Sequence, residues 1–230
     1  SSGIEVGQQL VKHPKVKAVG FTGSIKGGTA LYKLANDRKE PIPVYAEMGS
    51  INPVVILPSA LEEKGSFWAK QYAGSITVGA GQFCTNPGLL LAVKSNALES
   101  FITELGKEIS EIAPTPMLHP NICKTYQKGV KTASEQSNTS VVASYDTEAS
   151  PNFGKQKVLT VAGSEFLKNP VLHQEVFGPY SIIVQCENDA ELKTVLDALE
   201  GQLTGTILGN SNELAHKSEI VEALKERVGR

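Results

Sequence analysis

Apolar positions along this 230-residue chain alternate between short continuous runs and helically spaced stripes. The short runs indicate buried strands, which we predict at residues 16–21, 54–57, 89–93, 181–186 and 204–208, and near residues 141 and 158. Leu98, Phe101, Leu105 and Ile109 share one helical face. Helices are predicted at residues 25–36, 59–78, 121–135, 188–199 and 211–227. Because strands alternate with helices, we expect an α/β fold with an open, mostly parallel sheet and flanking helices.

Composition and charge exclude several classes of function. The net charge is −2, so no basic field points to nucleic acid or an anionic membrane as a partner. No apolar run approaches the roughly 20 residues that span a bilayer, and the first residues carry no secretory pattern. The three cysteines, Cys84, Cys123 and Cys186, are far apart and form no metal-type pair. We expect a cytoplasmic protein without a metal site.

Two motifs carry groups suited to covalent catalysis. Cys84 lies in Gly-Gln-Phe-Cys-Thr-Asn-Pro-Gly, and Glu47 begins Glu-Met-Gly-Ser-Ile-Asn-Pro. A thiolate can attack a carbonyl carbon, and a carboxylate can move protons to or from water. Taken singly, the cysteine is also consistent with a buried packing residue and the glutamate with a solvated turn.

Two further motifs suit a phosphate-bearing cofactor. Gly23 and Ser24, followed by Gly28, lie where a strand turns into a helix, and N–H groups at a helix start bind phosphate oxygens. The same residues also fit a serine N-cap with a closely packed glycine. Glu175 and Phe177 lie in Glu-Val-Phe-Gly-Pro, which equally describes a tight turn.

The order of these four motifs resembles the NAD(P)-dependent aldehyde dehydrogenase family, and the resemblance covers the whole chain. It implies roles that the residues alone leave open: nucleophile for Cys84, general base in thioester hydrolysis for Glu47, and pyrophosphate contacts for Gly23 and Ser24. It also implies that Glu175 holds the nicotinamide–ribose hydroxyls and that Phe177 lies against the nicotinamide side of the cofactor. The family's usual Glu-Leu-Gly-Gly is here Glu47-Met48-Gly49-Ser50, which affects only how closely the backbone at Ser50 can approach a nicotinamide. The family's oxyanion-binding Asn side chain has no counterpart in this sequence, and Cys123 and Cys186 are expected to be packing residues.

The first 45 or so residues hold a single strand–helix–strand passage, whereas a dinucleotide-binding domain needs repeated units. We therefore expect residues 1–46 to be a C-terminal remnant of such a domain, and residues 47–230 to be a catalytic thiol domain truncated at its C-terminus. Such a piece is expected to be inactive by itself.

The resemblance implies oxidation of a small aldehyde to a carboxylate, with NADP or NAD as cofactor, through a cysteine thiohemiacetal and thioester. The motif variants look like the branch that acts on 2,5-dioxovalerate (α-ketoglutaric semialdehyde), and the full-length protein is expected to be a homo-oligomer. Two alternatives remain. One is a CoA-acylating aldehyde dehydrogenase, against which Glu47 argues, and the other is a non-catalytic fragment or assembly domain.

Overall fold

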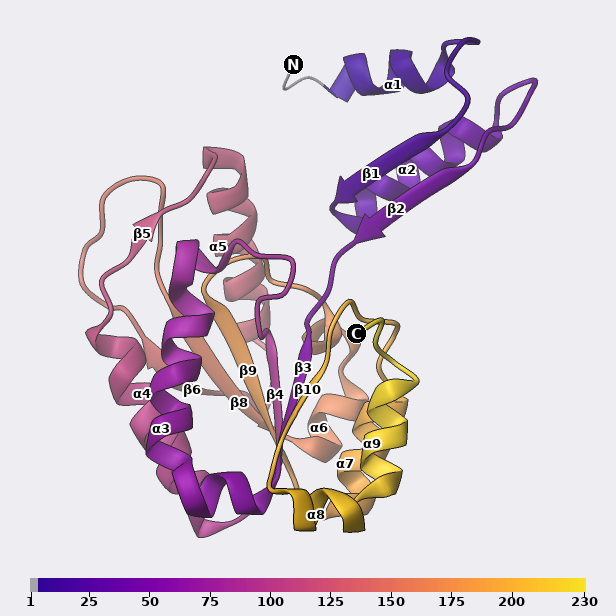
Figure 1. Cartoon of the computed structure of the whole chain (residues 1–230). Coiled ribbons are helices and arrows are strands. Elements are labelled where there is room, and N and C mark those ends of the chain that lie inside the picture. The colour runs from indigo at the N-terminus through magenta and orange to yellow at the C-terminus, as the bar shows by residue number, and fades with distance from the viewer. Residues whose placement is uncertain (1–3) are drawn as a thin grey trace. The chain divides into compact units, whose positions relative to one another are not determined.

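The computed structural model describes residues 4–230, and the chain divides into two compact units, Ser1–Gly49 and Ser50–Arg230. Figure 1 shows the elements of each unit. No helix within residues 4–230 is both long enough and apolar enough to cross a bilayer.

The first unit is one strand–helix–strand passage preceded by a helix. Its elements in chain order are α1 (Ile4–Lys12), β1 (Val19–Gly23), α2 (Ile25–Asn36) and β2 (Val44–Met48). The two strands run parallel, with Thr22 opposite Glu47 and Gly23 opposite Met48. A small apolar cluster holds the unit together, formed by Val11, Val19, Ala35 and Ile42 with Leu31 and Leu34 packed against it.

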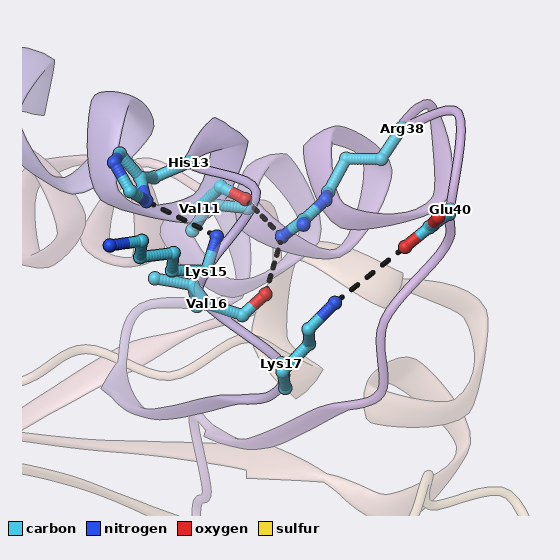
Figure 2. Close-up of polar contacts among 7 residues, drawn as sticks. All are labelled: Val11, His13, Lys15, Val16, Lys17, Arg38 and Glu40. Carbon is cyan, nitrogen blue, oxygen red and sulfur yellow. Dashed lines mark hydrogen bonds and ion pairs between the residues drawn. The ribbon is translucent and has the colours of Figure 1, made fainter.

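Arg38 ties the start of this unit to the loop that follows α2. Its Nη1 donates hydrogen bonds to the carbonyl oxygens of Val11, at 2.8 Å, and of Val16, at 3.0 Å (Figure 2). The nearby ion pair joins Lys17 Nζ and Glu40 Oε2 at 3.6 Å. Both side chains are well exposed, so the pair contributes little to stability. The partly buried guanidinium therefore fixes the connection from α1 to β1.

The second unit is built on a six-stranded sheet with the order β10-β3-β4-β9-β8-β6. In that order the strands are Thr206–Leu208, Pro53–Ile56, Leu89–Val93, Tyr180–Cys186, Lys157–Ala162 and Ser140–Ser144. All neighbours run parallel except β6, which is antiparallel to β8. The open, mostly parallel α/β sheet that the sequence predicts is thus confirmed.

Helices cover both faces of this sheet (Figure 1). On one face α3 (Pro58–Thr77) and α4 (Asn96–Glu111) pack against Val54, Ile56, Leu90 and Ile183. The opposite face packs against four other helices, which are α5 (Pro120–Ser134), α6 (Gly163–Lys168), α7 (Asp189–Asp197) and α9 (Ser218–Lys225). Short elements complete the unit: η1 (Val78–Gly81), β5 (Thr115–Pro116), β7 (Phe153–Gly154), η2 (Pro170–His173) and α8 (Ser211–His216).

Several local predictions need correction. The expected buried strand at residues 16–21 is β1, which begins at Val19 and has one buried residue, because within residues 4–230 its sheet contains only β2 beside it. The single helix expected at residues 211–227 is two helices, since Lys217 leaves helical geometry and pairs with Asp189 of α7. The helices α1 and α6 were not expected from the pattern.

Candidate active site

Cys84 lies on a tight turn that follows η1, and its side chain is exposed. The turn is closed by a hydrogen bond of 3.1 Å from the Asn86 N–H to the Phe83 carbonyl oxygen. The three residues Gly79, Ala80 and Gly81 before it all have positive φ angles, of 57°, 54° and 63°. Glycine adopts such angles freely, which explains why two glycines precede the thiol.

The side chain of Asn52, the residue before β3, binds the backbone of this turn. Its Nδ2 donates to the carbonyl oxygens of Cys84, at 2.9 Å, and of Asn86, at 2.8 Å. Asn52 is 3% exposed and has a φ of 46°, a conformation that asparagine tolerates better than most residues. The carbonyl groups at positions 83, 84 and 86 therefore all accept hydrogen bonds.

The N–H of Cys84 is different, because it donates to no acceptor within residues 4–230. In a trans peptide the N–H and the C=O point in opposite directions. The Phe83 oxygen faces the Asn86 N–H inside the turn, so the Cys84 N–H points away from it. The turn thus presents a thiol and an unpaired backbone donor together.

Glu175 and Phe177 are half-buried and line a small pocket with Ser50, Gly81 and Asn86. The space open to water there is about 10 Å³, enough for about one water molecule. Glu175 Oε1 accepts a hydrogen bond of 3.1 Å from the Ser50 N–H. Burial raises the pKa of the Glu175 carboxyl, and the Ser50 hydrogen bond opposes that rise. Residues of the motif at 175–179 and of the motif that contains Cys84 therefore lie side by side around this pocket.

In the first unit, Gly23, Ser24 and Glu47 lie at the carboxyl ends of the paired strands β1 and β2. Ser24 is the N-cap of α2, and its Oγ accepts from the Gly27 N–H at 3.2 Å. The N–H groups of Ile25 and Lys26 donate to no acceptor within residues 4–230, and free N–H groups at a helix start can bind phosphate oxygens. The Glu47 carboxylate is exposed and has no hydrogen-bond or ion-pair partner in the described part of the chain.

Gly28 of the same motif packs closely on Met48. A Cβ at Gly28 would lie 2.1 Å from Met48 Sδ, so the absence of a side chain at residue 28 makes room for the residue after Glu47. Both interpretations of this motif, capping and close packing, therefore describe what the local structure does.

The other two thiols are in the core. Cys123 is 4% exposed and Cys186 is fully buried, and burial raises the pKa of both, that of Cys186 to about 12. Among residues 4–230 no three His, Cys, Asp or Glu side chains gather as a metal site would require.

Comparison with known proteins decides the family. Residues 1–224 match the profile of the Aldehyde dehydrogenase family. The chain belongs to the aldehyde dehydrogenase family. The α-ketoglutaric semialdehyde dehydrogenase of Acinetobacter baylyi is 38% identical to it over 234 residues, covering 99% of this chain and 44% of that relative. For α-ketoglutaric semialdehyde dehydrogenase 2 of Azospirillum brasilense the identity is 40% over 228 residues, covering 99% of this chain and 43% of that relative.

Solved structures agree on the aldehyde dehydrogenase fold. Betaine aldehyde dehydrogenase from Staphylococcus aureus matches with a TM-score of 0.81 at 19% identity, over 100% of this chain and 46% of that one. An NAD-dependent benzaldehyde dehydrogenase from Corynebacterium glutamicum matches with a TM-score of 0.77 at 17% identity, over 99% of this chain and 52% of that one. This aldehyde dehydrogenase chain spans less than half the length of the curated relatives named above.

Sequence reasoning missed the roles of Ser50 and Asn52, although both lie inside a motif that it singled out. The signal was present in Asn52-Pro53, because asparagine is one of few residues that adopt positive φ and also bond to nearby backbone. What the sequence could not give is the partner, which lies 32 residues further along the chain.

Proposed function

We propose that this chain is the catalytic part of an NAD(P)-dependent dehydrogenase that oxidises α-ketoglutaric semialdehyde, or a related small aldehyde, to the carboxylate. The observation that carries the proposal is the turn at Cys84, which combines an exposed thiol with an unpaired backbone N–H. The two curated relatives above, at 38% and 40% identity, support the choice of substrate.

In this proposal the Cys84 thiolate adds to the aldehyde carbon, and the carbonyl oxygen becomes an oxyanion that the Cys84 N–H stabilises. NAD(P)+, when bound, supplies a hydride acceptor. Loss of the hydride leaves a thioester on Cys84. Glu47 takes a proton from water, the water oxygen attacks the thioester carbon, and the carboxylate product leaves as the thiol is restored.

The residues present suit a dinucleotide. The capped start of α2 at Gly23 and Ser24 offers free N–H groups to a phosphate, and Glu175 offers a carboxylate oxygen that accepts nothing from residues 4–230. Asn86 lines the same pocket as Glu175, and its buried Oδ1 accepts no hydrogen bond from the described residues. These acceptors suit the hydroxyl groups of a ribose, with Phe177 beside them. NADP and NAD both remain candidates, and the homo-oligomer stays a prediction.

The experiment is an assay of the gene product that contains this chain. It would be given α-ketoglutaric semialdehyde and a panel of simple aldehydes, each with NAD+ and with NADP+, and NAD(P)H formation would be followed. We expect turnover with at least one aldehyde and its loss in Cys84→Ser, with Cys123→Ser as the matched control. Equal activity of the Cys84→Ser variant would remove the thiol from the mechanism.

A further inference from the structure

The hydrogen bonds around Asn52 form a closed network at the base of the Cys84 turn. While Asn52 Nδ2 donates to the turn, its Oδ1 accepts from the Ser50 hydroxyl at 2.8 Å and from the Thr204 hydroxyl at 3.0 Å. Oδ1 also accepts from the Thr204 N–H, at 3.3 Å. An N–H group can only donate, and the carbonyl oxygens of Cys84 and Asn86 can only accept, so the amide can face only this way. The nitrogen is thereby held toward Cys84.

Ser50 belongs to this network through both its backbone and its side chain. Its N–H bonds to Glu175, while its hydroxyl lies 2.8 Å from Asn52 Oδ1 and 3.2 Å from Gln202 Oε1 and accepts from the Leu203 N–H at 3.0 Å. Glycine, which the family's usual motif has at this position, would supply the N–H but not the hydroxyl. The serine therefore adds a support for the amide of Asn52.

We propose that Asn52 is a positioning residue that holds the Cys84 turn in the geometry for attack on the aldehyde, and that the Ser50 hydroxyl helps to hold its amide in place. The proposal rests on the proposed role of Cys84 as the nucleophile. Asn52 does not reach the reacting atoms. It acts on them by fixing two carbonyl groups of the turn, and so the direction of the Cys84 N–H and of the thiol.

The burial of Asn52 makes its hydrogen bonds to the turn hard to replace. Asn52 is 3% exposed, so little water can replace its amide, and the carbonyl oxygens of Cys84 and Asn86 would lose a partner if the amide were removed. The Asn86 carbonyl keeps one bond, from the Gly88 N–H at 2.9 Å. No other hydrogen bond to the Cys84 carbonyl is found within residues 4–230, so the peptide between Cys84 and Thr85 is the one that would lose its support.

The test compares Asn52→Gly and Asn52→Asp in the gene product that contains this chain. Glycine adopts the positive φ at residue 52 without strain, so Asn52→Gly removes the amide and little else. Asn52→Asp keeps the shape but replaces the donor by an acceptor. The readouts are the rate of the pre-steady-state NAD(P)H burst, the KM for coenzyme, and Tm, all for protein shown to be folded.

Asn152 provides the matched control. It also has a positive φ, of 70°, and its Nδ2 also donates to a carbonyl oxygen, that of Met117 at 2.6 Å. We expect both Asn52 variants to slow the burst about 10-fold or more, since small misplacements of reacting groups have effects of that order. The coenzyme KM should stay within about two-fold, and Asn152→Gly and Asn152→Asp should leave the burst within about two-fold, as expected for sites remote from the reacting atoms.

Three outcomes separate the possibilities. A lowered Tm with an unchanged burst in both Asn52 variants would make the residue merely structural and overturn the proposal. If Asn52→Asp does not fold, Asn52→Gly decides in the same way, and Ser50→Ala should slow the burst by a smaller factor. A burst that survives in Cys84→Ser would instead overturn the proposed nucleophile, and that result is obtained with Asn52 untouched.

Discussion

The backbone of Gly81 lies directly against the carbonyl group of Gly178. A Cβ built at Gly81 would lie 2.3 Å from both the carbonyl carbon and the oxygen of Gly178, and the φ of Gly81 is 63°. This contact joins the motif of Cys84 to the motif of Glu175, backbone to backbone, with no flexible side chain between them. The absence of a side chain at Gly81 therefore allows the two motifs that line the pocket to lie this close together.

Replacement of that glycine should be costly. We expect Gly81→Ala to lower the free energy of unfolding by about 2–5 kcal/mol, because a positive φ and an unavoidable backbone overlap add together. Gly74 is the matched control, since it lies in the helix α3 with nothing within 4 Å of its would-be Cβ. Gly74→Ala should stabilise by about 0.5–1 kcal/mol in urea unfolding. Equal effects of the two changes would contradict the packing described.

Thiol chemistry should single out Cys84. With limiting iodoacetamide at pH 8, mass spectrometry of peptides should find the label on Cys84 first, because Cys84 is exposed, whereas the other two thiols are buried and burial raises their pKa. With a pKa of about 12, Cys186 has a thiolate fraction of about 10⁻⁴ at that pH. Faster labelling of Cys123 or Cys186 in the native protein would be the opposite result.

Alkaline pH should destabilise the second unit. Burial raises the pKa of Tyr126, Tyr180 and Cys186 in the folded state, while in the unfolded chain these groups titrate from about pH 8.5 to 10. The unfolded state therefore loses protons first, and the stability that is present below about pH 8.5 is lost as the pH rises. Urea unfolding at pH 8, 9, 10 and 11 should give a falling free energy, and a flat profile would contradict this.

The coenzyme should bind less well as Glu175 is protonated. Because burial raises the pKa of this carboxyl above its ordinary value of 4.5, its loss of charge begins at a higher pH than for an exposed glutamate. We expect the coenzyme Kd of the gene product to rise as the pH falls from 8 to 5. In Glu175→Gln the coenzyme Kd should be higher at pH 8 than in the unchanged protein, and it should change less with pH. Identical pH profiles of the two proteins would exclude Glu175 from coenzyme binding.

How far the sequence predicts this structure depends on the range of the interactions involved. Helix α2 was predicted with its bounds, and so was strand β4, because caps, apolar runs and helical spacing are local signals. The break at Lys217 was not predicted, since its side chain pairs with Asp189, on another helix. Local patterns carry no information on such contacts.

The candidate site divides in the same way. The motif around Cys84 is enough to identify it as a candidate. The supporting contacts are long-range, because the Ser50–Glu175 hydrogen bond joins residues 125 positions apart and the Asn52–Cys84 hydrogen bond joins residues 32 positions apart. Only the parallel order of β3, β4 and β9 brings these segments to one edge of the sheet. A motif can name the reacting groups, whereas the groups that hold them become visible when the strands are placed.

The separate role proposed for Glu47 has its own test. If the carboxylate activates water, Glu47→Gln should lower steady-state turnover of the gene product by about 10²-fold or more, as loss of a general base does. The pre-steady-state burst of NAD(P)H should survive, because hydride transfer precedes hydrolysis. Glu40→Gln, at an exposed glutamate of the same unit, serves as the control. Unchanged turnover of Glu47→Gln would remove it from the mechanism.

Cys84 is proposed to carry the acyl group during the reaction, and trapping that acyl group would test the proposal. The Glu47→Gln variant would be mixed with α-ketoglutaric semialdehyde and coenzyme, quenched in acid, digested and analysed by mass spectrometry. We expect a thioester on the peptide that contains Cys84, formed only when coenzyme is present, and none in Cys84→Ser. NAD(P)H formation with no acyl group on Cys84, or with the acyl group on another residue, would contradict it.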